Sequence, residues 1–435
     1  MRLLWSALVL IGLTAPASAQ TVTRTTLTLP EALDIAKKNN PTYLQSVTGR
    51  TRASAAVRAA YGQLLPSADV SVGTCFREGR PQFFGGVAFG ATADIISSNW
   101  NLSANSRLSY TTLTSIRRAN ASMDAANSDV EAALYFLRNA VTAQFLLALQ
   151  TQARAALQDT LVTQQRLQLE LAQARAGVGS GTSLDVKRAE VGLGTQQVAA
   201  LRARNTAAVA RLQLFQQIGV PMPDGLVLSA ELPVTAPTAT VEDLLAMARQ
   251  ANPALRAVQA RERVAVQGVQ SARGEYTPTL SLSASVGGVA QKDTLTNPYP
   301  FGFTRNPYNL SMSISLPLFD GFGREQRLQE ANASRTDARY GVRRQELALT
   351  ADVTSTRVTL QAAFEAVGLQ TRNAATASEA LQLAQERYRV GANTFVDLTT
   401  ARAEYERAET DRIDAIYEFH RAYAALESAV GRTLR

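Results

Sequence analysis

The sequence contains two copies of one pattern, in register, with a single constant spacing between matching positions. The longest match sets residues 178–186 against residues 390–398, with Val, Gly, Thr and Asp at the same offsets in both. Shorter matches at this spacing are Asn40-Pro41 with Asn252-Pro253, Pro66 with Pro278, residues 119–122 with 331–334, and Ile218-Gly219 with Val430-Gly431. Solenoid repeats run about 20 to 50 residues. Each copy is far longer and is therefore a half-structure of several elements, and the function is expected in what two such halves enclose.

The first residues predict export. Arg2 supplies a positive charge, residues 3–13 form an apolar run, and Ala17-Ser18-Ala19 is the small-x-small pattern that signal peptidase cuts. Residues 1–19 are therefore a predicted signal peptide, and a cut before Gln20 offers no cysteine for a lipid anchor. No later stretch has the roughly 18 to 20 uninterrupted apolar residues of a membrane-spanning helix. The mature protein is expected either to be soluble outside the cytoplasm or to cross a membrane as β-strands.

Composition excludes several kinds of site. Cys75 is the only cysteine, so an intramolecular disulfide is impossible. His420 is the only histidine and there are five methionines, which leaves neither a multi-histidine metal site nor a soft-metal relay. No acid, base and nucleophile stand together, so neither catalysis nor a cofactor is predicted. The formal charge is +8, but Lys and Arg alternate with Asp and Glu without interleaved aromatics, which favours solvated helix faces over nucleic-acid binding.

Helical and strand periodicities alternate in the same order in both copies. The first copy predicts helices over 30–39, 42–62, 115–176 and 183–218, strands over 67–74 and from about 100 to 113, and a turn at 177–181. The second copy predicts helices over 241–250, 254–274 and 322–388, and strands after Pro278 and over 309–318. In the last of these strands apolar residues alternate with serine for about ten residues, which is typical of a transmembrane barrel strand. An ordinary sandwich strand is the alternative, but only four such strands occur, each pair between very long helices.

Helix lengths constrain the architecture. The segment 115–176 has 62 residues and spans about 93 Å at 1.5 Å per residue. Segments 42–62 and 183–218, stacked end to end, cover about 86 Å, so each half is expected to pair one long helix with one composite helix. Four strands cannot close a barrel, and an open edge in lipid leaves backbone groups unsatisfied. The chain is therefore expected to oligomerise, and three copies would supply 12 strands.

These elements predict a division of the chain. After the signal peptide, a first repeat covers 20–219, with a β-hairpin at about 66–113 and a helical hairpin at 115–218. A linker covers 220–240. A second repeat covers 241–435, with a β-hairpin at about 278–319 and a helical hairpin at 322–430.

With these features, the chain resembles the TolC-type outer membrane efflux proteins over essentially all of its mature length. The specific part is the paired motif Val-Gly-x-x-Thr-x-x-Asp, which places Gly179 with Thr182 and Gly391 with Thr394 at two helix-hairpin tips. The resemblance implies a mainly α fold with a pair of transmembrane β-hairpins. It further implies a homotrimeric 12-stranded β-barrel in the outer membrane, continuous with a long α-helical barrel in the periplasm. Implied partners are outer-membrane lipid, a periplasmic adaptor protein and an inner-membrane transporter, and the implied cargo is small molecules or proteins.

The resemblance also implies a gate at the periplasmic tip. By position, Asp397 and Asp185 match gate aspartates and Tyr388 matches a bridging tyrosine. Two residues depart from the family's pattern: Asn393 replaces an arginine and Thr400 replaces a second ring aspartate. Asparagine cannot form the bidentate, charge-assisted bonds of arginine. The latch is therefore expected to be looser or to use another basic residue; the candidates are Arg387, Arg389 and Lys187.

Two alternatives accompany this interpretation. Asp185 and Asp397 also suit the first turn of a helix, where a carboxylate caps free N–H groups. The whole chain could instead be a soluble periplasmic coiled-coil scaffold or adaptor in which the alternating segments form a small β-domain. The glycine-rich loop 177–182 is similar to a phosphate-binding loop, but it follows a helix and lacks the lysine of a P-loop, so a hairpin turn is expected.

Overall fold

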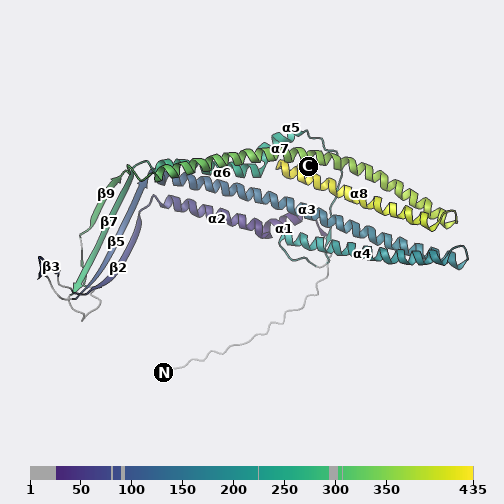
Figure 1. Ribbon diagram of the computed structural model, residues 1–435, viewed down its shortest axis with the longest axis horizontal. Helices are drawn as coiled ribbons and strands as arrows, with labels where there is room; N and C mark the ends of the chain where they lie inside the picture. The colour runs from purple at the N-terminus through teal and green to yellow at the C-terminus, as the bar shows by residue number, and fades with distance from the viewer. Residues whose placement is uncertain are drawn as a thin grey trace, which may run out of the picture.

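A computed structural model describes residues 26–79, 82–89, 94–223, 225–292, 302–305 and 307–434; the predicted signal peptide, residues 1–19, lies outside them. The molecule is elongated, with a sheet of long strands at one end and paired helices along the rest of its length (Figure 1). Two turns, each of which joins one helix to the next, lie together at the end farthest from the strands (Figure 1).

The helices and strands alternate in the same order in both halves. The helices are α1 (Leu29–Asn39), α2 (Pro41–Gly62), α3 (Tyr110–Gly177), α4 (Ser183–Ile218), α5 (Val241–Ala251), α6 (Pro253–Gly274), α7 (Gly323–Arg389) and α8 (Phe395–Val430). The strands are β1 (Thr26–Leu27), β2 (Ser67–Arg77), β3 (Gln82–Phe84), β4 (Val87–Phe89), β5 (Ile95–Ser109), β6 (Val227–Leu228), β7 (Thr279–Lys292), β8 (Thr304–Arg305) and β9 (Asn309–Ser315). Three helices of the first copy have exact counterparts in the second copy: α1 corresponds to α5, α2 to α6 and α4 to α8. Each pair begins and ends at matching positions of the sequence repeat. The sequence repeat is therefore a structural repeat.

The helices form a curved wall one helix thick. In the half next to the strands, α2 packs on α3, α3 on α6, and α6 on α7. In the far half, α4 packs on α3, α3 on α8, and α8 on α7. The long helices α3 and α7 therefore run the whole length, while α2 with α4 and α6 with α8 form composite helices, as predicted from the segment lengths.

The Asn-Pro motifs form the joints of these composite helices. The Asn40 side chain caps α2 by accepting the Tyr43 N–H at 3.0 Å, and its Nδ2 donates to the Gln217 carbonyl at the end of α4 at 2.7 Å. Gly219 ends α4 in the left-handed region, at φ 88°, and a Cβ there would lie 2.6 Å from the Asn39 carbonyl oxygen. Asn-Pro and Ile-Gly are thus the two sides of one contact, which explains why both recur in the sequence.

We expect Asn252→Ala to loosen the equivalent joint between α6 and α8. Asn252 is buried; it accepts the Leu255 N–H at 3.0 Å and donates to the Ala429 carbonyl at 2.9 Å. Losing a helix cap and leaving a buried carbonyl without its donor should destabilise the protein by about 2 kcal/mol. Thermal unfolding followed by circular dichroism checks this, with exposed Asn373→Ala as the control. An unchanged midpoint of thermal unfolding in Asn252→Ala would contradict the expected contribution of this joint to stability.

The long strands form one antiparallel sheet in the order β2-β5-β7-β9, with β8 beside β9 on the same edge of β7. In each of the four strands, apolar and polar residues alternate, and the register places the apolar residues of neighbouring strands opposite one another. One face presents mainly apolar residues in cross-strand rows such as Val70, Leu102 and Val286, or Leu282 and Met312. The opposite face presents mainly Ser and Asn, in rows such as Ser71 with Asn101, and Asn105 with Ser283 and Ser311. The sheet is therefore apolar on one side and polar on the other.

The structure corrects some predicted bounds. β5 runs from Ile95 to Ser109, earlier than the predicted 100–113, and α3 begins at Tyr110 rather than 115. The reason is a cap: Ser109 Oγ accepts the Thr112 N–H at 3.2 Å, which starts the helix despite the β-branched residues that follow. β9 ends at Ser315 instead of 318. Periodicity also missed β1, β3, β4, β6 and β8, each only two or three residues long.

By length and composition alone, α3 contains the one segment of the described helices that could cross a membrane. Several of its apolar side chains have partners within the protein. Val141, Phe145 and Leu149 are buried in a core cluster with residues of α1 and α4. Part of the apolar composition of α3 is therefore explained by packing at the middle of the helical wall.

Candidate functional site

The candidate site is the tip formed by the α3–α4 and α7–α8 turns. Gly179 and Gly391 adopt left-handed conformations there, with φ 75° and 82°, which favours glycine. Ser180 N donates to the Arg175 carbonyl at 2.9 Å, and Ala392 N donates to the Arg387 carbonyl at 2.8 Å. The two turns thus have the same local construction at matching positions of the two copies.

The threonine and aspartate of each motif form a capping box. Thr182 Oγ1 accepts the Asp185 N–H at 3.2 Å and donates to Asp185 Oδ2 at 2.8 Å. Thr394 and Asp397 repeat these two bonds at the same distances. The Asp397 carboxylate also accepts the Thr394 backbone N–H at 2.9 Å. The capping role considered for both aspartates is therefore confirmed, and it orients each carboxylate at the start of its helix.

Asp397 is exposed, and its carboxylate is held in the charged form. The backbone hydrogen bond from Thr394, and next the bond from the Thr394 hydroxyl, lower the pKa of Asp397 below its ordinary value. A lowered pKa in the folded state means that this cap stabilises the helix above the ordinary carboxylate range and loses its effect as the pH falls through the lowered value. At neutral pH the Asp397 charge is fully present for any ligand at the tip.

Tyr388 lies in the apolar core of the tip rather than at its surface. Its side chain is 3% exposed and packs with Phe395 at a ring-centroid distance of 6.1 Å. Burial raises the pKa of Tyr388, which the nearby Arg175 charge partly offsets. The same core cluster contains Ala172 and Ala189 from the other hairpin. Within one chain, the two tips are therefore packed against each other.

Arg175 is the residue that sequence reasoning missed. Its guanidinium carbon lies 4.5 Å from the centre of the Tyr388 ring, and its Nη1 donates to the Tyr388 carbonyl. Its Nη2 donates to the Ser180 carbonyl in its own turn at 3.1 Å. Arg175 therefore holds the first hairpin tip to the second. The repeat contained a signal, because Arg387 is the counterpart of Arg175 in the second copy, but the contact between hairpins is visible only in the structure.

The other predicted tip residues do not link the hairpins of one chain. Lys187 pairs with Glu190 at 2.8 Å and Arg389 pairs with Glu386 at 2.9 Å, each within its own helix. The Thr400 hydroxyl donates to the Val396 carbonyl at 3.0 Å. Among the described residues, the side chains of Asn393 and Arg387 form no hydrogen bond or ion pair. The three basic candidates therefore do not replace the family's latch inside the chain.

A polar seam joins α3 to α8 above the tip. Arg154 Nε donates to Asp414 Oδ1 at 2.8 Å and a second Arg154 nitrogen contacts the other carboxylate oxygen, so the pair is bidentate. Arg402, only 8% exposed, donates to the Leu161 carbonyl at 3.1 Å. Burial lowers the pKa of Arg402. The two hairpins of one chain are therefore joined by directional polar bonds along their length, in addition to the apolar core at the tip.

No described residues form a metal-binding cluster. Across the part of the chain that the structure describes, no group of three or more His, Cys, Asp or Glu side chains could hold a metal ion. His420 is 3% exposed and its ring contacts Phe419 at 5.2 Å, within the packed stripe of α8. Cys75 lies exposed on β2, on the polar side of the sheet.

Comparisons with known proteins identify the architecture. The family model for "Outer membrane efflux protein" matches residues 244–432. Protein CyaE of Bordetella pertussis is 29% identical over 314 residues, which cover 71% of this chain and 63% of that protein. The outer membrane protein VceC of Vibrio cholerae superposes with a TM-score of 0.75 at 18% identity, covering 94% of this chain and 97% of that chain. The open-state outer membrane channel MtrE of Neisseria gonorrhoeae gives a TM-score of 0.76 at 20% identity, covering 94% and 89%.

These matches confirm the resemblance inferred from the paired tip motifs. The two solved outer-membrane proteins have the fold described above over almost the whole chain. The sequence match to CyaE spans just under two thirds of that protein. The second repeat of the chain matches the outer membrane efflux protein family, and almost the whole chain has the fold of solved outer-membrane proteins.

Proposed function

We propose that three copies of this chain form an outer-membrane exit duct without enzymatic activity. The observation that carries the proposal is that the chain is open along both sides. Its sheet has two free edges and its helical wall has two free edges, on matching sides: β2, α2 and α4 on one, β9 and α7 on the other. One chain therefore cannot enclose a space, whereas side-by-side copies can.

The free strands require partners if the sheet lies in lipid. β2 and β9 pair on one side only among the described strands. Unpaired backbone N–H and C=O groups are not tolerated in the hydrocarbon layer. Pairing β2 of one copy with β9 of the next satisfies both edges, and three copies give a 12-stranded barrel. The apolar face, with Val70 72% and Met312 69% exposed, would then face lipid, and the serine-rich face would line the pore.

The free helix edges carry matching apolar stripes. On α4 the exposed stripe lies opposite the side that packs on α3. Its members are Leu184, Val191, Val198 and Leu212, which are separated by seven or fourteen residues. On α7 the exposed stripe lies opposite the side that packs on α6 and α8: Tyr340, Leu347, Val358, Leu369 and Leu383. Such spacings are typical of coiled-coil seams. We infer that α4 of one copy packs against α7 of the next.

The proposed pore lies on one face of the wall. A hollow is lined by residues from four neighbouring helices, among them Ser46 of α2, Ala133 of α3, Arg261 of α6 and Gln345 of α7. A hollow that spans four helices indicates a wall that curves toward that face. The opposite face of α7 carries Arg357, which donates to the Ala239 carbonyl just before α5 at 3.1 Å. In a closed ring, the hollow face would line the tunnel and α5 would lie outside.

Cysteine pairs test the assembly. Leu212 lies about 44 Å along α4 from its start at the tip, and Val358 about 46 Å along α7 from its end there, so the two stripes should meet at these residues. In a Cys75→Ser background, Leu212→Cys combined with Val358→Cys should give covalent dimers and trimers on non-reducing gels after mild oxidation. Either cysteine alone gives at most a dimer. A monomeric double-cysteine protein would contradict the trimer.

The proposed gate is the ring of three Asp397 carboxylates at the tip, with Asp185, Tyr388, Asn393 and Thr400 around it. Three like charges within a Debye length of about 8 Å repel one another unless a cation lies between them. The charged, exposed state of Asp397 supports this proposal. With Asn393 and Thr400 in place of the family's arginine and second aspartate, we expect the closed tip to be held less tightly across copies.

Replacing Asp397 with alanine should weaken block by multivalent cations. Hexamminecobalt added from the periplasmic side should block single-channel current less in Asp397→Ala than in wild type, while conductance in monovalent salt changes little. Asp243→Ala removes a similar cap, made with Thr240 at the start of α5 and away from the tip, and serves as the control. Equal block in Asp397→Ala and wild type would mean that the carboxylate is only a helix cap.

The duct would work with a periplasmic adaptor and an inner-membrane transporter, and would pass small molecules or proteins delivered by that transporter. A soluble periplasmic scaffold or adaptor is the competing function. The exposed apolar face of the sheet favours the membrane, because a soluble protein would need to cover it. Membrane fractionation separates the two: recovery of the full protein as a soluble monomer would exclude the duct.

A further inference from the structure

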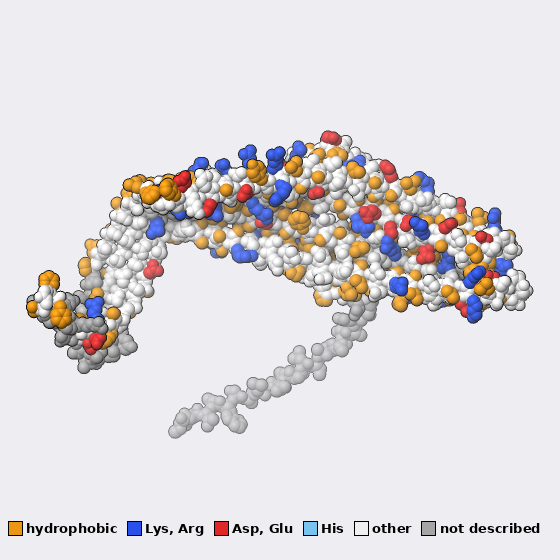
Figure 2. All heavy atoms as spheres, viewed as in Figure 1, with side chains coloured by type: hydrophobic (Ala, Val, Ile, Leu, Met, Phe, Trp, Pro, Cys, Tyr) orange, Lys and Arg blue, Asp and Glu red, His pale blue; other side chains and the backbone are white. Residues whose placement is uncertain are grey.

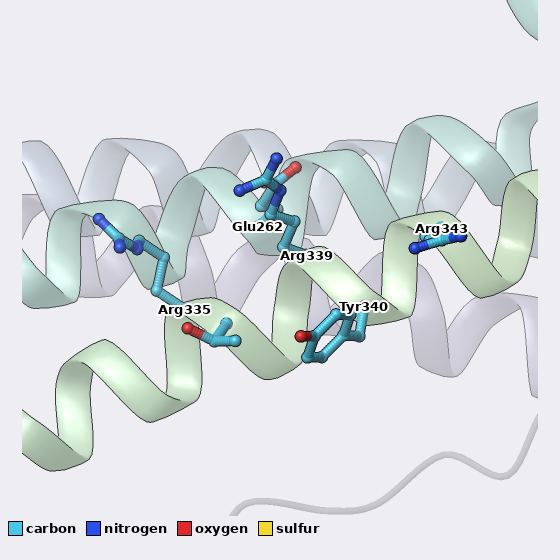
Figure 3. Close-up of a pocket in the computed structure, with 6 residues that line it drawn as sticks. Glu262, Arg335, Arg339, Tyr340 and Arg343 are labelled. Atoms are coloured by element: carbon cyan, nitrogen blue, oxygen red, sulfur yellow. The ribbon is translucent and has the colours of Figure 1, made fainter.

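We propose that the outer surface of the helical wall, between the membrane and α5, binds a carboxylate-bearing polymer of the cell wall through arginines of α7. This inference rests on the trimeric, outer-membrane orientation proposed above. Arg335, Arg339 and Arg343 are spaced four residues apart on α7 and line one shallow hollow with Glu262 of the neighbouring α6. Figure 3 shows the three arginines following one another along α7.

The three guanidinium groups have no hydrogen-bond or ion-pair partner in the part of the chain that the structure describes. Among the described residues, none of Arg335, Arg339 and Arg343 forms a hydrogen bond or an ion pair. Glu262 and the nearby Glu346 are not paired with them either. Two arginines on the hollow face of the wall, in contrast, are neutralised across helices: Arg261 pairs with Asp129 at 2.7 Å and Arg327 pairs with Glu275 at 2.7 Å. The row of Arg335, Arg339 and Arg343 therefore retains its charge among the described residues.

These arginines point away from the proposed tunnel. Arg357 lies 14 residues after Arg343, about four helical turns on the same face. It donates to the Ala239 and Pro237 carbonyls of the segment leading into α5. Gln345, which lines the hollow face, is two residues from Arg343 and therefore about 200° away around the helix. The row lies on the α5 side of the wall, the outside of the proposed ring.

A neighbouring copy would not neutralise the row. In the proposed ring, α2 of the next copy lies beside this part of α7, and α2 contains Arg50, Arg52 and Arg58 but no Asp or Glu. Over α2, residues 110–140, α6 and residues 323–352, the chain has 16 arginines, no lysine and 9 acidic residues. That band carries nearly all of the formal charge of +8. Figure 2 shows Lys and Arg side chains recurring along the edge formed by α7.

The depth of the row excludes lipid headgroups as the main partner. Leu318, Phe319 and Phe322 are 86%, 74% and 68% exposed just before α7, and in the proposed orientation they would lie at the membrane interface. Arg335 and Arg343 follow the first residue of α7 by about 18 and 30 Å, whereas the headgroup layer is only about 5 to 8 Å thick on each side. At that depth the partner must be an anion of the periplasm. Arginine binds carboxylates in a planar, bidentate manner, and the peptide stems of the cell wall present such carboxylates in a repeating array.

Co-sedimentation with purified sacculi tests the inference. The detergent-solubilised wild-type trimer should sediment with sacculi and be released by salt, because exposed ion pairs are screened. The triple variant Arg335→Gln, Arg339→Gln and Arg343→Gln should bind about tenfold more weakly, as expected for the loss of three exposed contacts. A control variant with Arg166→Gln, Arg372→Gln and Arg407→Gln removes the same charge from exposed positions nearer the tip and should bind like wild type.

Two further binding experiments, with amidated sacculi and with lipid vesicles, identify the partner. Wild-type protein should fail to bind sacculi whose carboxylates have been converted to amides, a test that needs no variant to fold. Vesicles containing phosphatidylglycerol serve as the lipid comparison. Equal sacculus binding by wild type and the α7 variant, or a loss confined to the vesicles, would overturn the proposal. The Leu212→Cys and Val358→Cys pair, introduced into each of these proteins in the Cys75→Ser background, reports trimer assembly separately, so failed assembly is not mistaken for failed binding.

Discussion

Arg175→Ala should open the tip. The substitution removes a charge-assisted hydrogen bond to the Tyr388 carbonyl and a guanidinium stacked on the Tyr388 ring. Such contacts contribute about 2 kcal/mol together in each chain, which corresponds to a roughly thirtyfold shift in the ratio of separated to packed hairpins. We expect larger single-channel conductance in planar bilayers and increased passage of vancomycin into cells that produce the variant.

Arg166→Ala is the matched control for this experiment. Arg166 lies on the same helix, is exposed, and forms no hydrogen bond or ion pair among the described residues. Its loss should leave conductance unchanged. Arg175→Lys keeps the charge but not the planar stacking, so an intermediate conductance is expected. A closed, wild-type conductance in Arg175→Ala would show that the contacts between copies alone close the tip.

Leu149→Pro should abolish trimer assembly. Leu149 lies near the middle of α3, is 6% exposed, and belongs to the core cluster shared with α1 and α4. Proline removes a helical hydrogen bond and clashes with the preceding turn, at a cost of about 3 kcal/mol or more, and the buried leucine contacts are lost as well. Because α3 contacts α2, α4, α6 and α8, a kink there displaces both halves of the wall.

Trimer yield on unboiled gels measures this effect. Leu149→Met retains the helix and most of the side-chain volume and should assemble normally. Normal trimer levels in Leu149→Pro would contradict a continuous wall helix at this position and the ring derived from it.

The elements and their repetition could be predicted from the amino-acid sequence. The constant spacing between the two copies, the alternation of apolar residues with serine, and the paired Thr-x-x-Asp motifs are local or periodic signals, which depend on backbone geometry over a few residues. They predicted every helix to within a few residues, except that α3 starts five residues earlier than expected. That error came from a single hydroxyl, Ser109, whose cap competes with the strand pattern around it.

Which of these residues meet could not be predicted in the same way. The joints between Asn40 and Gln217 and between Arg175 and Tyr388 connect positions 177 and 213 residues apart. No local pattern distinguishes Arg175 from its counterpart Arg387, because both occupy the same place in the same turn. The difference arises from how the two hairpins lie against each other. Hydrogen bonds and ring contacts depend on separations in space of a few ångströms, which follow from the packing of whole helices and not from the spacing of residues along the chain.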